Sequence, residues 1–207
     1  MLFVVPGIIF AGLFLLVNYF AILEEKNINE SILLSWNKAR ENFINYLRDD
    51  EKHERYEILE ESFIQLDSVG VEILPQTMPP FPWHFGGQRF HNLFVHSKEI
   101  ADFCRRNDMR ICYDISHSYL TCNEYDYSIN EFSREVGQYV AHLHIADAVG
   151  VNGEGLQIGE GEMNFGEILA NLEEYCPTAS FIPEIWQGHK NGGENFWIAL
   201  QKLEGLL

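Results

Sequence analysis

Apolar residues follow two different rhythms along the chain. Between Asn29 and Leu47 they recur every three or four positions, which predicts an amphipathic helix that begins near Asn29. A second helix is expected from about Glu54 to Leu66, and Gly70 ends the connection that follows it. Beyond Gly70 the pattern changes to short apolar runs separated by segments of helical periodicity. Residues 29–66 are therefore expected to be mainly helical, and the region beyond Gly70 to alternate between strands and helices.

The alternating region predicts a parallel sheet. Strands that alternate with helices are typical of βαβ units, in which successive strands pair in parallel. We therefore expect an α/β fold without an internal repeat or a linker between two domains. The strands are expected at Val71–Leu74, Met109–Tyr113, Val140–Ala146 and Phe181–Ile185, and the helices at His96–Arg106, Ile129–Tyr139, Phe165–Tyr175 and Glu194–Leu206.

Each of the four expected strands carries or is closely followed by a side chain that can bind a metal ion. Glu72 lies in VEILPQ, Asp114 in CYDISH, His144 in HLHIAD and Glu184 in FIPEIW. Because the carboxyl ends of parallel strands share one face of a sheet or barrel, these side chains are expected to converge. Carboxylates combined with one imidazole suit a divalent ion such as Mn²⁺, Mg²⁺ or Zn²⁺. The pattern predicts a site for one divalent ion.

Each of these residues has a plainer interpretation when it is considered alone. A single Glu in a strand usually faces solvent, and Asp114 with His117 could form a helix cap. His142 and His144 lie two positions apart and share one side of their strand, where one could be a hydrogen-bonded core histidine. If packing alone determined the residues at the four strand ends, Val or Ile would be expected there. The joint pattern therefore favours a site over four separate coincidences.

The ordered motifs resemble those of the xylose-isomerase-like TIM-barrel superfamily, over about residues 54–207. That group includes sugar-phosphate isomerases and epimerases, and it shares a fold with AP endonuclease family 2. The resemblance implies a TIM-barrel-like (β/α) fold, and its ketose-epimerase branch implies one metal held by Glu72, Asp114, His144 and Glu184 with His117 beside them. The motifs that carry the resemblance are Glu72, Asp114-x-x-His117, His142-x-His144, Glu184 and the loop GEGEMNF at 159–165.

The resemblance also implies a reaction on a sugar or sugar phosphate. A divalent ion that bridges the carbonyl and neighbouring hydroxyl oxygens acidifies the carbon-bound proton. Glu72 or Glu184 then removes that proton to give an enediolate, and re-protonation yields the isomer or epimer. Residues expected to contact the substrate are Trp83, His84, Asp147, Glu160, Trp186 and His189, and residues expected to bind either metal or substrate are His117 and His142.

The loop Pro79–Gly87, which carries Trp83 and His84, has two interpretations. Aromatic rings pack on sugar faces and exclude water, so the loop could cover a substrate. It could equally be a rigid proline-rich surface loop.

The length of 207 residues is short for the implied fold, since a closed eight-stranded barrel typically needs about 250 residues. Four strands are expected, or five if Leu2–Val5 is one. The barrel is therefore expected to be N-terminally truncated, and a homo-oligomer or a partner chain could complete it. The expected domains are an apolar segment at 1–23 and an incomplete barrel at 24–207.

Residues 1–23 contain no charged side chain, and the first one is Glu24. As a helix this segment would extend about 34 Å, enough to cross a bilayer core of roughly 30 Å. The alternative is a buried strand at Leu2–Val5 that turns at Pro6-Gly7 into a core helix. Membrane association is expected only under the first alternative.

Composition and cysteine usage indicate which classes of partner and which cellular compartment to expect. The chain has 31 acidic and 14 basic residues and a net charge of −17, which argues against nucleic acid because phosphate binding needs clustered Lys and Arg. The cysteines Cys104, Cys112, Cys122 and Cys176 form no C-x-x-C pair and are expected to be reduced core thiols of a cytoplasmic protein. The alternatives to an isomerase or epimerase are a truncated, non-catalytic metal- or sugar-binding module and an AP-endonuclease-like phosphodiesterase.

Overall fold

The computed structural model describes residues 55–63, 72–81 and 92–206. The chain divides into the units Met1–Glu51 and Lys52–Leu207, and the described residues all belong to the second unit. The apolar segment 1–23 and the helix expected at 29–47 lie outside the described residues, and so do Trp83 and His84. Among the helices of the described ranges, none is both long enough and apolar enough to span a bilayer.

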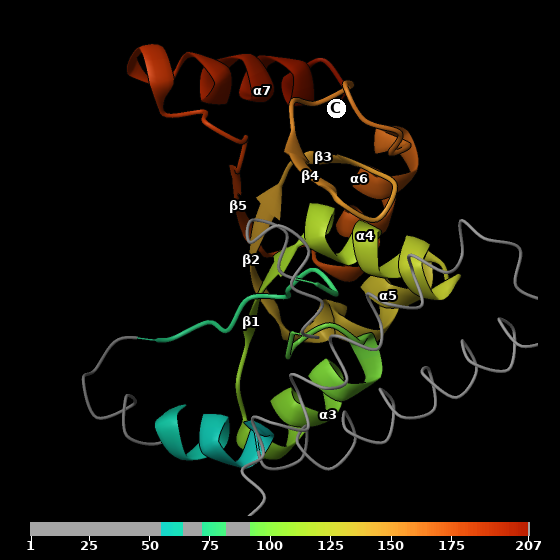
Figure 1. Cartoon of the computed structure of the whole chain (residues 1–207), viewed down its shortest axis with the longest axis vertical. Coiled ribbons are helices and arrows are strands. Elements are labelled where there is room, and N and C mark those ends of the chain that lie inside the picture. Colours follow the sequence, from blue (N-terminus) through green and yellow to red (C-terminus); the bar gives the residue numbers. More distant parts are fainter. Residues whose placement is uncertain (1–54, 64–71, 82–91, 207) are drawn as a thin grey trace, which may run out of the picture. The chain divides into compact units, whose positions relative to one another are not determined.

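A parallel three-stranded sheet lies among the helices of the second unit (Figure 1). Its strand order is β1-β2-β5, so strands that follow one another in the sequence-predicted series are also neighbours in the sheet. The chain returns in the same direction each time, which is the βαβ connection that the alternating pattern predicted. The strands are β1 (Ile111–Asp114), β2 (Val140–Ile145) and β5 (Ser180–Pro183).

The sheet contact expected from Val71–Leu74 forms a few residues later than predicted. Residues 72–75 have no strand structure, and a parallel bridge joins Gln76 to Cys112 of β1. The backbone N–H of Cys112 donates to the Pro75 carbonyl at 3.0 Å, and the N–H of Thr77 donates to the Cys112 carbonyl at 3.0 Å. Pro75 has no N–H of its own to donate to a ladder. Gln76, and not Glu72, therefore lies beside β1.

Helices flank the sheet, and side-chain caps begin three of them. The Asp114 carboxylate accepts the His117 N–H, the Ser128 hydroxyl accepts the Asn130 N–H, and the Asn164 amide oxygen accepts the Glu167 N–H. The helix at 55–63 agrees with the second expected helix. The other helices are α3 (Ser97–Asn107), α4 (Ile115–Tyr125), α5 (Ile129–Val136), α6 (Phe165–Tyr175) and α7 (Glu194–Glu204), with short 3₁₀ helices at Gly137–Tyr139 and Lys190–Gly192.

Two elements near the sheet were not predicted from the sequence. Helix α4 contacts β1, β2, β3, β4 and α5, so it has apolar or small buried residues on several faces and lacks an amphipathic stripe. The second is an antiparallel hairpin of β3 (Asp147–Val149) and β4 (Gly153–Leu156). Its β4 strand reads GEGL, in which glycine replaces the alternating apolar residues that indicate a strand.

The hydrophobic core lies between the sheet and the helices. Tyr113 of β1 is fully buried, stacks on Phe132 of α5 with ring centroids 5.6 Å apart, and shares a 2.9 Å hydrogen bond with the Ser133 hydroxyl. This packing anchors β1 just before Asp114. The cysteines are free and buried, as expected: Cys104, Cys112, Cys122 and Cys176.

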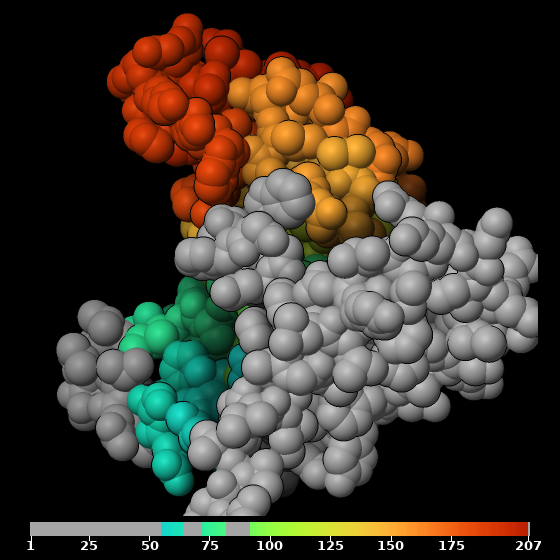
Figure 2. Space-filling model, viewed as in Figure 1, coloured from blue at the N-terminus to red at the C-terminus, as the bar shows by residue number. Residues whose placement is uncertain are grey.

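The C-terminal segment holds the loop that follows the β3–β4 hairpin. The Lys202 ammonium of α7 donates to the Ile158 carbonyl at 2.7 Å, and the Gln157 amide donates to the Asn195 carbonyl at 3.0 Å. In Figure 2 the red C-terminal surface adjoins the orange surface that includes the hairpin. The hairpin region is therefore fixed from the side of the sheet that carries β5.

Candidate functional site

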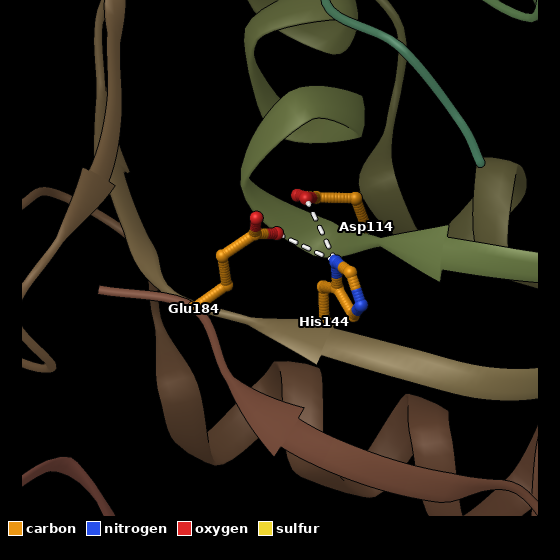
Figure 3. A group of neighbouring side chains, drawn as sticks. All are labelled: Asp114, His144 and Glu184. Carbon is orange, nitrogen blue, oxygen red and sulfur yellow. Dashed lines mark ion pairs between the residues drawn. The ribbon is translucent and has the colours of Figure 1, made fainter. Parts of the chain in front are cut away.

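Three side chains from the strand ends point toward one another (Figure 3). Asp114 is the last residue of β1, His144 lies near the end of β2, and Glu184 directly follows β5. The His144 Nδ1 atom lies 2.5 Å from Glu184 Oε2 and 3.8 Å from Asp114 Oδ2. One potential ligand atom from each residue lies within 4.8 Å of the other two. Two carboxylates and one imidazole at this spacing suit a divalent cation.

The register of the sheet explains this convergence. Asp114 is paired with His144 across β1 and β2, and His144 is paired with Ile182 across β2 and β5. Glu184 lies two residues beyond Ile182, so its side chain emerges on the same face as that of Ile182. The Glu184 N–H donates to the Ile145 carbonyl at 3.1 Å and so continues the ladder past the end of β5.

The two carboxylate oxygens of Asp114 have different roles. Oδ1 accepts the His117 N–H and the Ser116 hydroxyl, both at 3.0 Å, and so caps α4. Oδ2 accepts the Gln76 amide N–H at 2.9 Å and faces the ring of His144. The helix-cap and metal-ligand interpretations of this residue are therefore compatible. The side chain is only 2% exposed, and this burial raises the pKa of Asp114 to about 6.

His144 and Glu184 form an ion pair. The neighbouring Cys112 thiol and the Glu184 carboxylate raise the pKa of His144 to about 10. The hydrogen bond from His144 in turn lowers the pKa of Glu184. Near neutral pH the ring is therefore protonated and Glu184 is ionised.

These pKa shifts predict how metal binding depends on pH. A histidine must lose its proton to coordinate a metal, so each ion bound near pH 7.5 should release about one proton, from His144. Below the Asp114 pKa of about 6 a second proton must leave, so affinity should fall more steeply with decreasing pH there. Calorimetry of Mn²⁺ binding in buffers of different protonation enthalpy measures this release. Binding heats at pH 7.5 that do not depend on the buffer would contradict it.

The structure does not bring Glu72 to this group. Arg110 donates to both carboxylate oxygens of Glu72, with Nε 2.7 Å from Oε1, and these hydrogen bonds lower the pKa of Glu72. Arg110 immediately precedes β1, whereas Asp114 ends it. Glu72 is therefore placed near the amino end of β1, and its half-exposed side chain faces away from the three residues at the carboxyl end.

Gln76 and Thr77 are site residues that the sequence reasoning missed. Gln76 donates to Asp114 Oδ2 as described above, and the buried Thr77 hydroxyl donates to the Asp114 carbonyl at 3.1 Å. The Thr77 carbonyl lies 3.0 Å from His117 Nδ1. A search for acidic and imidazole ligands passes over both residues, although their position directly after an apolar run and Pro75 indicated the end of a strand.

His117 lies between the three-residue group and a further carboxylate. Its Nδ1 atom is 3.4 Å from Asp114 Oδ2, and its Nε2 atom is 3.4 Å from Oε2 of Glu154 on β4. Sequence reasoning missed Glu154 as well. The signal was the Gly153-Glu154-Gly155 triplet, where two glycines flank an acid in the way that Gly159 and Gly161 flank Glu160.

Asp147 is fully buried, and its carboxylate is occupied by backbone donors. Oδ1 accepts the N–H groups of Ala148 and Met163, and Oδ2 accepts those of Gly159 and Gly161, at 2.8 to 3.2 Å. A side chain at Gly161 would collide with the Asp147 carboxylate, so glycine is required there. In this arrangement the Asp147 carboxylate organises the GEGEMNF loop.

Among the remaining residues expected to bind metal or substrate, His142 lies beside a member of the group, and the others are exposed. The ring centroid of His142 is 5.3 Å from that of His144, and its Nδ1 atom lies 2.8 Å from the Ser180 hydroxyl. Burial lowers the pKa of His142. Trp186 is 62% exposed, two residues after Glu184, while Glu160 and His189 are exposed outside the group.

The comparison with family models agrees with the fold. Residues 23–202 match the family described as xylose isomerase-like TIM barrel. An uncharacterized protein of Methanocaldococcus jannaschii is 30% identical over 125 residues, which cover 57% of this chain and 40% of that protein. A D-tagatose 3-epimerase-like protein of known structure is 21% identical over 67% of this chain and 50% of its own, with a TM-score of 0.46.

A xylose isomerase domain protein from Planctomyces limnophilus is 18% identical over 72% of this chain and 50% of its own, with a TM-score of 0.49. The chain thus spans half or less of the length of these relatives.

Proposed function

Since the chain belongs to the family of xylose isomerase-like TIM barrels, which it matches over residues 23–202, we propose that it is a divalent-metal-dependent sugar or sugar-phosphate isomerase or epimerase. The observation that carries the proposal is the convergence of Asp114, His144 and Glu184 at the ends of three adjacent parallel strands. Active sites of barrel enzymes are built at the carboxyl ends of the barrel strands.

The proposed metal ligands are Asp114 Oδ2, His144 Nδ1 and one Glu184 oxygen. A divalent ion held there would polarise the carbonyl of a bound sugar and acidify the neighbouring C–H. The donor set fits such an ion because it supplies two carboxylates and an imidazole whose potential ligand atoms already lie close together. Gln76 supports the site by holding the Asp114 oxygen in place through its amide N–H.

Glu184 is the proposed general base. Its side chain is 51% exposed, so a ligand can reach it, whereas Asp114 is 2% exposed and bonded on both oxygens. Glu72 was the other candidate from the sequence, but Arg110 holds it near the amino end of β1. The carboxylate of Glu184 would therefore take the proton from the carbon beside the sugar carbonyl, and its return to the former carbonyl carbon would complete an isomerisation. Epimerisation would instead need a proton delivered to the opposite face of the carbon that lost it.

Proton exchange with solvent tests this function. In D₂O, the Mn²⁺-loaded protein should incorporate deuterium beside the carbonyl of at least one member of a panel of ketoses and ketose phosphates, followed by NMR. Glu184→Gln removes the base and should lower the exchange rate at least about 100-fold. Glu173→Gln, an exposed glutamate on α6, serves as the matched control.

Two outcomes would redirect the assignment. Tight metal binding without exchange into any panel member would favour the non-catalytic metal- or sugar-binding module. Exchange that persists at the normal rate in Glu184→Gln would reject Glu184 as the base.

A further inference from the structure

We infer that Thr77 is a positioning residue of the metal site, because its hydroxyl holds the main chain of Asp114 at the point where β1 ends and α4 begins. The inference rests on the proposed function, since it concerns how one ligand of that site is held. The side chain of Thr77 is fully buried, so it acts through Asp114 and not by contact with a ligand.

The first observation is that the Thr77 side chain takes the place of a backbone hydrogen bond. Gln76 is bridged to Cys112 of β1, and the Thr77 N–H donates to the Cys112 carbonyl at 3.0 Å. In a regular parallel ladder the next bond would join the Asp114 N–H to the Thr77 carbonyl. The Asp114 N–H instead donates to the Thr77 hydroxyl oxygen at 2.9 Å. The ladder thus ends here with the buried Asp114 N–H still paired.

The second observation is that the same hydroxyl reaches the Asp114 carbonyl. Thr77 Oγ1 donates to this carbonyl at 3.1 Å, so one side chain bonds both polar groups of the Asp114 main chain. A threonine hydroxyl can donate one hydrogen and accept another, so the two bonds are compatible. The Ser118 hydroxyl of α4 donates to the same carbonyl at 2.8 Å and lies 3.2 Å from Thr77 Oγ1. Ser118 therefore shares the carbonyl, whereas the Asp114 N–H is held by Thr77.

The position of Asp114 matters because its carboxylate has two roles. Oδ1 accepts the His117 N–H as the cap of α4, and Oδ2 faces the ring of His144. The main chain changes from the extended conformation at Asp114 to a helix at Ile115. A rotation of this backbone would move Oδ2 relative to His144, and functional side chains must be held within about 0.5 Å of their productive geometry. The two hydrogen bonds of Thr77 oppose that rotation.

The segment that carries Thr77 is itself anchored. The bridge from Gln76 to β1 precedes Thr77, and the N–H of Met78 after it donates to the Phe94 carbonyl at 2.9 Å. The Gln76 amide also donates to Asp114 Oδ2 at 2.9 Å. Two consecutive residues thus hold Asp114, Gln76 by its side chain and Thr77 by its main chain.

Mn²⁺ affinity, measured by calorimetry, tests the inference with a pair of conservative variants. Thr77→Val keeps the shape of the side chain but removes the hydroxyl, so Mn²⁺ affinity should fall about tenfold or more, as is typical when an outer partner of a metal ligand is lost. Thr77→Ser keeps the hydroxyl and should bind Mn²⁺ within about threefold of the unmodified protein.

Thr121→Val is the matched control. Thr121 is also fully buried, and its hydroxyl donates to the His117 carbonyl within α4 at 3.2 Å. The substitution removes a buried hydroxyl without changing a bond to Asp114, so Mn²⁺ affinity should stay within about twofold. The absorption spectrum of bound Co²⁺ depends on coordination geometry and gives a second readout. It should change in Thr77→Val and stay the same in Thr121→Val and Thr77→Ser.

Ser118→Ala keeps the inference testable if Thr77→Val does not fold. This variant removes the other hydroxyl from the Asp114 carbonyl and leaves both bonds of Thr77 in place. Mn²⁺ affinity should therefore stay within about threefold. A loss of about tenfold or more would assign the positioning of Asp114 to Ser118 and overturn the inference.

Four further results would overturn the inference: no Mn²⁺ binding to the unmodified protein, unchanged Mn²⁺ affinity in Thr77→Val, an equal loss in Thr121→Val, or a loss in Thr77→Ser as large as that in Thr77→Val. Failure of the proposed function is distinguishable, because it appears as absent deuterium exchange while Mn²⁺ binding and its dependence on Thr77 persist.

Discussion

Asp114→Asn is expected to lower Mn²⁺ affinity at least about 100-fold, because changes to the outer partners of metal ligands alone typically cost roughly 10–100-fold. Asparagine keeps an oxygen that can cap α4 but replaces the buried carboxylate oxygen that faces His144. The fold should therefore survive while the metal site is lost. Calorimetric titration with Mn²⁺ measures the affinity, and circular dichroism checks that α4 and the other helices remain.

Glu72→Gln is the informative comparison for this variant. The sequence pattern predicted Glu72 as a metal ligand, whereas the structure pairs it with Arg110 in a half-exposed ion pair. Such surface pairs contribute about 0–1 kcal/mol to stability, so the substitution should change neither the fold nor Mn²⁺ affinity by much. A metal affinity that falls as far as in Asp114→Asn would restore Glu72 to the ligand set and reject the structural assignment.

Asp147→Ala is expected to reduce the free energy of unfolding by about 3 kcal/mol or more, since each buried N–H left without a partner costs about 1–3 kcal/mol. The substitution removes the acceptor of four backbone N–H groups, those of Ala148, Gly159, Gly161 and Met163. Urea denaturation followed by tryptophan fluorescence measures the loss. Hydrogen exchange should locate it in the loop at 157–163.

Glu160→Ala on the same loop provides the control for stability. Its side chain is exposed, and the backbone N–H of Glu160 donates to the Gln157 carbonyl whatever the side chain is. The change in unfolding free energy should stay within about 0.5 kcal/mol. If Asp147→Ala lowered the unfolding free energy as little as this control, the Asp147 carboxylate would not be organising the loop. The contact with substrate that the sequence predicted for Asp147 would then be the better interpretation of this residue.

The sequence predicted that Asp114, His144 and Glu184 lie close together, and the structure confirms this proximity, because each side chain is tightly linked to the end of a strand. Asp114, His144 and Glu184 each occur at or just after an apolar run, and parallel strands bring their carboxyl ends together whatever the details of packing. Glu72 differs because its apolar run is followed by Pro75, and the sheet contact forms only at Gln76. A register shift of a few residues moves a side chain from the carboxyl end of the parallel strands toward their amino end. The local sequence pattern does not fix that register.

Helix α4 and the β3–β4 hairpin show more clearly what the periodicity of apolar residues does not predict. The amphipathic signal used to find helices depends on one face meeting water, and α4 is packed on several sides. The hairpin depends on the Asp147 carboxylate and on the tie from Trp186 to Gly155, which join residues far apart in sequence. Glu154 was consequently overlooked, although the triplet that carries it is visible in the sequence.

The sequence by itself determined the α/β class, the order of the parallel strands and three chemically suited residues at their ends, because hydrophobic period and strand direction are local properties. Only the tertiary structure decided which acids face one another. It pairs Glu72 with Arg110, hydrogen-bonds Asp147 to the backbone of the 159–163 loop, and brings Glu154 close to His117. Side-chain partners depend on strand register and on long-range hydrogen bonds, which arise only when distant segments pack together.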